Sequence, residues 1–111
     1  MMPDTVSEAG FQQAIVELAY RLGWRVQHSR AIQTRNGRWM TAIQGHNGFP
    51  DIVLAHPKHG VLIAELKTAR GRLGADQLLW RDALEPHIEY HLWRPSDWDD
   101  IVNRLKGTTA T

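Results

Sequence analysis

The sequence contains no cysteine. This absence excludes disulfide bonds, zinc sites built from thiolates and catalysis by a cysteine nucleophile, and it is consistent with a reducing compartment. Long apolar runs are also missing, because the longest, at 52–55 and 61–64, are far shorter than the roughly 20 residues that span a bilayer. The first residues have no basic stretch followed by an apolar segment, so no signal peptide is expected. We therefore expect a soluble, cytoplasmic protein without a membrane partner.

A large excess of charge of one sign is lacking too. Thirteen basic and twelve acidic residues give a net charge of +1, which by itself is weak support for a nucleic-acid partner. Ten of the basic residues are arginine, and five of these fall between Arg21 and Arg38. Arginine is well suited to bidentate phosphate contacts. Two interpretations stay open, an ordinary solvated surface and a surface that binds the phosphates of a nucleic acid.

The length and composition are those of one globular domain. The chain has 111 residues, of which 42% are hydrophobic and 23% charged, and this is enough for a single core of modest size. We expect one domain over residues 1–107 and a disordered tail at 108–111.

Residues 7–22 have the pattern of an amphipathic helix. Apolar side chains recur there at helical spacing, at Phe11, Ile15, Leu18, Ala19 and Leu22. Gly23 is placed to end this helix, and Thr5 with Glu8 has the spacing of a capping box at its start.

Strand patterns dominate the middle of the chain. A first strand is predicted at 24–27, and the dipeptide Asn36-Gly37 predicts a hairpin turn within 28–47, although a mobile basic loop is equally compatible with that stretch. Two clearer strands, at 51–55 and 60–67, are joined by a short turn and predict an antiparallel hairpin.

The last third of the sequence predicts two helices around one strand. A helix is expected over 76–84, because Pro86 prevents its continuation, and a strand over 88–93. Ser96 and Asp99 form a second capping box that opens the last helix, and Gly107 ends it. The order helix, several strands, helix, strand, helix predicts a mixed α/β domain.

Two acidic residues stand out because each interrupts an apolar strand. Asp51 opens the segment DIVLA, and Glu65 lies inside VLIAELK. Two carboxylates held about 4 Å apart repel by roughly 4 kcal/mol at an effective dielectric of 20, so such a pair indicates a cation between them, most naturally Mg²⁺. Lys67 lies two residues after Glu65 and therefore on the same face of the strand.

This arrangement suits phosphodiester hydrolysis, in which a metal polarises the phosphate and a nearby cation orients the nucleophile. A plainer interpretation is that Asp51 is a turn residue and that Glu65 with Lys67 is a solvent-facing pair worth under about 1 kcal/mol.

The spaced motif resembles the PD-(D/E)XK nuclease superfamily. Gly48-Phe49-Pro50-Asp51 is followed after thirteen residues by Glu65-Leu66-Lys67 and then by Gln77. Within the superfamily the sequence is most similar to the VRR-NUC family, the virus-type replication-repair nucleases. Further elements of that pattern follow the family's order over about residues 7–95: Glu8, Gly23-Trp24, Thr68, Gly71-Arg72 and Gln77.

The resemblance implies a restriction-endonuclease-like core and a role for each matched residue. Asp51 and Glu65 would bind Mg²⁺ or Mn²⁺, with the backbone carbonyl of Leu66 as a third protein ligand. Lys67 would position or activate the attacking water, and Gln77 would hold the lysine or a phosphate. The plainer interpretation of Gln77 is an ordinary exposed helix residue.

The resemblance also asks for an acidic residue on the first helix, and Glu8 and Glu17 both qualify. At roughly 100° per residue, Glu8 falls within about 50° of the centre of the apolar stripe and Glu17 about 130° away. We therefore predict that Glu8 faces the metal, directly or through water, and that Glu17 faces solvent. The capping role with Thr5 is the alternative for Glu8.

Other residues of chemical interest give weaker signals. His56 and His59 are expected to be solvated turn residues rather than metal ligands. Trp39, in its basic setting, is the best candidate for stacking on a base, whereas Trp24 and Trp80 are expected in the core or at an interface.

The function that these patterns favour is a Mg²⁺- or Mn²⁺-dependent endonuclease that cuts DNA, with a preference for branched structures such as four-way junctions. Because small members of the family resemble archaeal-type Holliday-junction resolvases, we expect a homodimer. Trp93, Trp98 and the last helix are a first guess at its surface. Two alternatives remain, an inactive nucleic-acid-binding module of the same fold and a sequence-specific restriction-type nuclease.

Overall fold

The computed structural model of the chain describes residues 2–29, 32–33, 35–40 and 44–107. Its elements are, in chain order, α1 (Glu8–Arg21), β1 (Arg25–His28), β2 (Ile32–Gln33), β3 (Trp39–Met40), β4 (Ile52–His56), β5 (Gly60–Leu66), α2 (Ala75–Leu84), β6 (Glu89–Trp93), a short 3-10 helix η1 (Pro95–Asp97) and α3 (Trp98–Leu105). The predicted mixed α/β class is therefore confirmed. The expected tail at 108–111 lies outside the described residues.

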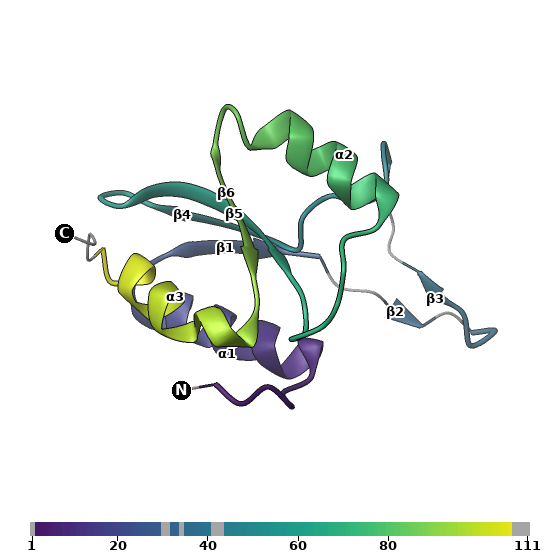
Figure 1. Cartoon of the computed structure of the whole chain (residues 1–111), viewed down its shortest axis with the longest axis horizontal. Helices are drawn as coiled ribbons and strands as arrows, with labels where there is room; N and C mark the ends of the chain where they lie inside the picture. Colours follow the sequence, from purple (N-terminus) through teal and green to yellow (C-terminus); the bar gives the residue numbers. More distant parts are fainter. Residues whose placement is uncertain (1, 30–31, 34, 41–43, 108–111) are drawn as a thin grey trace.

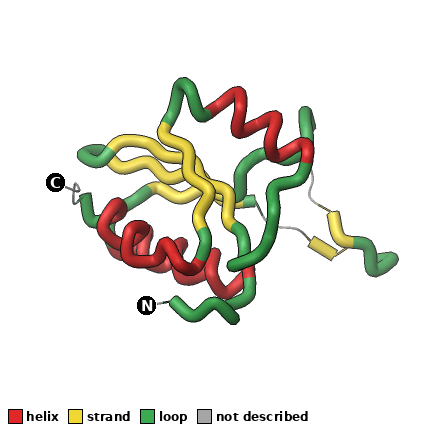
Figure 2. Tube along the Cα trace, in the orientation of Figure 1, coloured by secondary structure: helices red, strands yellow, loops and turns green. Residues whose placement is uncertain are grey.

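The main sheet has four strands in the order β1-β4-β5-β6. β4 pairs antiparallel with β1 and with β5, which confirms the predicted hairpin, whereas β5 and β6 run parallel. A parallel pair needs a crossover connection, and α2 provides it. Figures 1 and 2 show α2 on one face of the sheet and α1 with α3 on the other.

The hydrophobic core lies between the sheet and the α1–α3 layer. Its buried members come from these two helices, from the sheet and from the residue before β1: Phe11, Ile15, Val16, Ala19, Trp24, Ile52, Leu54, Leu62, Ala64, Leu66, Trp93, Ile101 and Leu105. Because side chains alternate along a strand, the β5 residues Leu62, Ala64 and Leu66 face this core, and Ile63 and Glu65 face α2. Residues 62–66 are all buried, so β5 is covered on both sides.

The ends of α1 are fixed by its own sequence, but not by the predicted capping box. Ser7 is the N-cap, and its hydroxyl accepts a hydrogen bond from the Gly10 amide at 3.0 Å. Thr5 lies two residues too early, so the prediction of a Thr5–Glu8 box is wrong. At the other end Gly23 adopts φ 84°, which confirms the predicted stop, because a left-handed residue closes a helix most easily as glycine.

The capping box predicted for the last helix is also wrong. The chain first forms η1, and the Asp97 carboxylate accepts a hydrogen bond from the Arg94 amide at 2.8 Å. Ser96 and Asp99 therefore do not form the pair that the sequence suggested. Gly107, with φ 78°, ends the helix as expected.

Trp24 connects the two helices on the core side. Its side chain is 3% exposed, and its indole N–H donates to the Leu105 carbonyl at 2.9 Å. This confirms the expected core position. His56 and His59 were expected in solvent, but their rings stack on one another at 4.3 Å and also contact Trp24. The ring contacts hold the β4–β5 turn against Trp24, and the Arg104 guanidinium of α3 donates to the His59 carbonyl at 2.7 Å.

Trp93 is 4% exposed and belongs to the core. It therefore cannot contribute to a dimer surface as the sequence suggested. The described helices include none that is long and apolar enough to cross a membrane.

The strands β2 and β3 form a separate small hairpin. Ile32 pairs with Met40 and Gln33 with Trp39, and Gly37 in the turn has φ 79°. Figure 1 shows this hairpin extending away from the main sheet. The predicted turn is confirmed for the described residues, whereas the predicted strand positions Ala31 and 41–43 lie outside them.

Candidate active site

Asp51 and Glu65 lie opposite one another at the end of the β4–β5 hairpin. The register pairs Ile52 with Ala64, so the next pair outward is Asp51 with Glu65, and their side chains share the face toward α2. Asp51 is held in place because its Oδ2 accepts a hydrogen bond from the Leu66 amide at 2.8 Å. The hairpin thus brings together the two acids that the sequence singled out.

Glu65 is 1% exposed and is the one buried charged side chain among the described residues. Its Oε1 accepts a hydrogen bond from Gln77, while its Oε2 is buried and has no hydrogen-bond partner within the described part of the chain. Burial, a hydrogen bond that the protonated Glu65 makes with Asp51 and the charge of Asp51 raise the pKa of Glu65 from 4.5 to about 8, and Lys67 acts in the opposite direction. An ionised carboxylate is thus costly at this position unless a further cation faces it.

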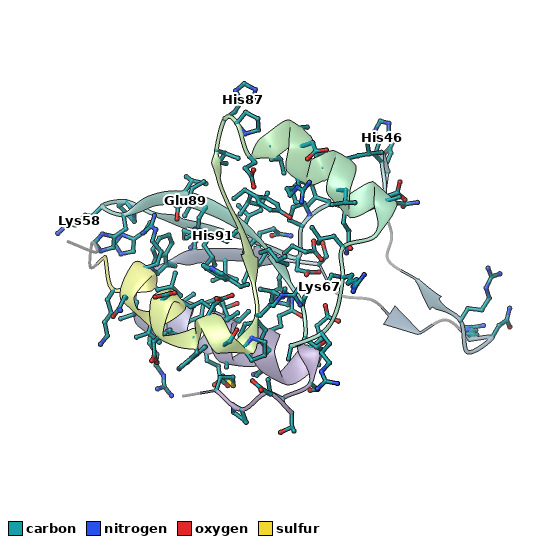
Figure 3. The ribbon with its side chains drawn as sticks, viewed as in Figure 1. His46, Lys58, Lys67, His87, Glu89 and His91 are labelled. Carbon is teal, nitrogen blue, oxygen red and sulfur yellow. The ribbon has the colours of Figure 1, made fainter. Side chains whose placement is uncertain are left out.

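Lys67 leaves β5 directly beside this pair. Its backbone amide donates to the Trp93 carbonyl at 3.0 Å, and its side chain is half-buried. Gly71 lies against the lysine stem, since a Cβ added there would be 3.3 Å from the lysine Cδ. Figure 3 shows Lys67 on the side of the molecule from which the β2–β3 hairpin extends.

Gln77 connects α2 to the site. Its Nε2 donates to Glu65 Oε1 at 2.9 Å, and its Oε1 accepts from the Gly74 amide at 2.8 Å. The amide group is thus fixed at both ends, which excludes the interpretation of Gln77 as an ordinary exposed helix residue. No hydrogen bond from Gln77 to Lys67 is present in the described structure.

Gly48 fixes the loop that leads to Asp51. Its φ is 89°, and a Cβ added there would lie 2.6 Å from the backbone carbon of Asp76. Only glycine allows this close approach between the loop and the first turn of α2. The glycine of the Gly-x-Pro-Asp motif therefore has a packing reason, independent of any resemblance.

The two candidate acids of α1 differ in their relation to Glu65. Both are exposed, but the charge of Glu8 contributes to the raised pKa of Glu65. Glu17 instead accepts a hydrogen bond from Gln13 at 3.0 Å. Glu8 is therefore within electrostatic reach of the site without touching it.

No family model, curated protein or solved structure matches this chain. In the described part of the chain, no three side chains of His, Cys, Asp or Glu are grouped so that they could hold a metal ion. The site offers two carboxylates, one of them with an unpartnered buried oxygen, and one ammonium group.

Two residues near the site were not predicted from the sequence. The Tyr90 hydroxyl is buried without a hydrogen-bond partner among the described residues, and burial, followed by the charge of Glu65, raises its pKa to about 12. Arg94 donates to the carbonyls of Thr68 and Gly71, at 2.8 and 2.7 Å, and so fixes the loop after Lys67. The only sequence signal for Tyr90 is that its side chain lies on the same face of the sheet as Glu65. No sequence signal indicates the role of Arg94.

Proposed function

We propose that this protein is a Mg²⁺- or Mn²⁺-dependent DNA endonuclease with a PD-(D/E)XK core, similar to the VRR-NUC family. The proposal rests above all on Glu65, a buried carboxylate with an unpartnered oxygen beside a second carboxylate and a lysine. A structural acid of this kind is normally paired or hydrogen-bonded through both oxygens. An acid left incomplete in this way is typical of a functional site.

A divalent cation fits the donors that are present. Carboxylate and carbonyl oxygens are the ligands that Mg²⁺ prefers, and a cation beside Glu65 Oε2 would offset the repulsion from Asp51. Asp51, Glu65 and the Leu66 backbone carbonyl would hold the ion. Glu8 does not touch the site and would act through a water molecule. When bound, such an ion supplies Lewis acidity and lowers the pKa of a coordinated water.

The remaining residues act through their own positions. Lys67 supplies a positive charge on the Glu65 face of the strand, where it can orient a water molecule and offset negative charge that develops on a phosphate. Gln77 keeps Glu65 in a single orientation through its hydrogen bond. It is a positioning residue in this proposal.

The β2–β3 hairpin supports DNA as the substrate. It leaves the body beside the site, because the Ser29 amide donates to the Asp51 carbonyl at 3.1 Å. Its turn holds two exposed arginines, Arg35 and Arg38. Since Arg35 follows Ser29 by six residues, it lies at most about 20 Å along the chain from the site, a span of roughly six phosphates along one strand. A preference for branched DNA and a homodimer, whose two-fold axis would place two sites on two strands, are part of the proposal.

The test is a cleavage assay on four-way junction, flap and linear duplex DNA of equal length, with Mg²⁺, Mn²⁺ or EDTA. We expect metal-dependent cleavage of the branched substrates that is lost in Glu65→Ala and Lys67→Ala. Equal cleavage of linear DNA would remove the branch preference and leave the chemistry standing. DNA binding without cleavage under any metal would favour an inactive nucleic-acid-binding module.

Glu8 and Glu17 offer a matched pair on one helix. Glu8→Gln is expected to weaken metal binding, because it removes a negative charge near Glu65. The metal concentration at which cleavage is half-maximal should therefore rise. Glu17→Gln removes the same charge farther along α1 and is expected to leave that midpoint unchanged. Light scattering at micromolar concentration tests the homodimer.

A further inference from the structure

A second feature lies next to the candidate site and outside the core. A hollow of about 240 Å³ opens between α2 and the loop that precedes Asp51, and its lining is mostly apolar: His46, Asn47, Asp76, Leu79, Trp80 and Ala83. Figure 3 shows His46 beside the end of α2 where the hollow lies. Trp80 was expected in the core or at an interface, and it is not in the core, because α2 has no buried residue.

Specific contacts hold the two walls of this hollow together. The Trp80 indole N–H donates to the Asn47 carbonyl at 2.9 Å, and Phe49 packs edge-on against the Trp80 ring at 4.9 Å. Gly48 brings the loop backbone against Asp76. The hollow is thus preformed, and the position of the Trp80 ring is fixed by both walls.

Both walls of the hollow belong to elements that also carry residues of the candidate site. On α2, the lining residue Asp76 precedes Gln77, which donates a hydrogen bond to Glu65. On the loop, Asn47 lies four residues before Asp51. The hollow and the candidate site thus share α2 and the loop before Asp51 but use different faces of the helix, because Asp76 and Gln77 are about 100° apart around it.

The apolar part of the lining lies outside the core and is open to solvent. Leu79 is 68% exposed, and a leucine in that position on a helix without buried residues does not stabilise the core. A single exposed leucine needs no explanation, but here it adjoins a fixed tryptophan and a hollow with polar residues in its lining. An apolar surface with a few polar groups at a preformed hollow is typical of a ligand-binding site.

We propose that this hollow binds one unpaired nucleobase of the DNA strand that is cut, stacked against Trp80 and Leu79. The inference rests on the proposed nuclease function and adds that one base of the bound strand is unpaired or is taken out of its pair when the DNA is bound. The volume is below the roughly 300–1,000 Å³ of pockets for drug-sized ligands, which matches a single base better than a peptide segment. Stacking on an aromatic ring is the usual way in which proteins bind unpaired bases, and Asn47 and Asp76 offer polar groups for a base edge.

The experiment compares two fluorescent single strands of equal length and equal charge, one of thymidines and one of abasic nucleotides. Affinities are measured in EDTA, so that no cleavage is needed, for the wild type and for Trp80→Ala, Trp80→Phe and Leu79→Ser. We expect the wild type to bind the thymidine strand about 5- to 150-fold more tightly than the abasic strand. Trp80→Ala should reduce this ratio to near 1, and Trp80→Phe should retain most of it.

Leu79→Ser serves as the second variant, because Trp80→Ala also removes the hydrogen bond to Asn47. The Leu79 side chain is mostly exposed, so the fold is expected to stay intact in this variant while the ratio of the two affinities falls. Equal binding of the two strands by the wild type, or no binding of either, would overturn the proposal. An equal loss of affinity for both strands in Trp80→Ala would do the same.

Two further arms separate other occupants. If free thymidine monophosphate displaced the strand as effectively as the strand itself, the hollow would be a mononucleotide site and the proposal would be wrong. If Leu79→Ser changed the oligomeric state while base dependence was absent, the occupant would be a second copy of the chain. The nuclease proposal is judged separately, since base-dependent binding without any cleavage would leave the hollow assigned and refute the catalysis.

Discussion

The raised pKa of Glu65 predicts an unusual pH dependence of stability in the absence of divalent metal. The pKa is about 8 in the folded protein, against an ordinary value of 4.5. The folded state therefore holds a proton on Glu65 between these values, when the unfolded chain has lost it. The stability that the protonated Glu65 contributes is fully present below pH 4.5 and is lost as the pH rises toward 8. The reason is that the free energy of unfolding falls with rising pH wherever the folded state binds more protons than the unfolded chain.

The magnitude follows from the same linkage. One proton gives a slope of at most about 1.4 kcal/mol per pH unit, and the full interval corresponds to roughly 5 kcal/mol as an upper value. A small domain has only about 5–15 kcal/mol of stability in total. The effect is thus large enough to measure by urea unfolding in EDTA from pH 5 to pH 9.

Glu65→Gln is the matched control, because it keeps the shape and removes the titration. We expect the variant to lack the loss of stability between pH 5 and 8 that the wild type shows. Titrating histidines are shared by both proteins and cancel in the difference. If the difference in unfolding free energy between the two proteins stayed constant over this pH range, the reasoning about a buried, proton-holding Glu65 would be refuted.

Three further predictions concern the fold and the DNA-binding surface. Gly48→Ala and Gly60→Ala both force an alanine to a φ of 89°, which costs about 1–2 kcal/mol, but only at Gly48 would the new Cβ meet the α2 backbone. Urea unfolding should therefore show an additional loss of stability of about 1–3 kcal/mol for Gly48→Ala. Equal losses in the two variants would argue against the close approach between Gly48 and α2. Trp24→Phe leaves the Leu105 carbonyl without its donor and is expected to cost about 1–3 kcal/mol by the same assay, whereas an unchanged midpoint would show that the hydrogen bond is replaced by water. Replacing Arg35 and Arg38 by alanine should weaken DNA binding and reduce the slope of log affinity against log salt concentration by about 1 for each arginine that neutralises a phosphate; an unchanged slope would remove the β2–β3 hairpin from the DNA-binding surface.

The sequence predicted the elements well where local patterns determine them. The apolar stripe of α1, the glycine that ends it and the alternating β4–β5 hairpin depend on periodicity and turn chemistry, which are local properties. The acidic pair also follows from this hairpin, because its register alone places Asp51 opposite Glu65. Gln77 was predicted only through the family resemblance.

The sequence failed where a residue's partner is distant in the chain or where several caps compete. Thr5 and Ser7 both have a side chain suitable for the N-cap of α1, and only the backbone conformation selects Ser7. Trp80 lies outside the core because α2 buries none of its residues, and the sequence did not decide between core and interface for this side chain. Its position instead depends on a hydrogen bond with the loop at Asn47, 33 residues away, which no periodicity encodes.

The most direct test of the central claim measures DNA cleavage and metal binding in the same two variants. Lys67→Ala and Glu65→Gln are incubated with a four-way junction and Mg²⁺, and metal binding is followed by the shift of the unfolding midpoint with metal concentration. We predict that neither variant cuts DNA, that Lys67→Ala is still stabilised by metal and that Glu65→Gln is not. Cleavage by Lys67→Ala at the wild-type rate, or a wild type that binds Mg²⁺ at this pair and cuts no DNA, would contradict the proposed function.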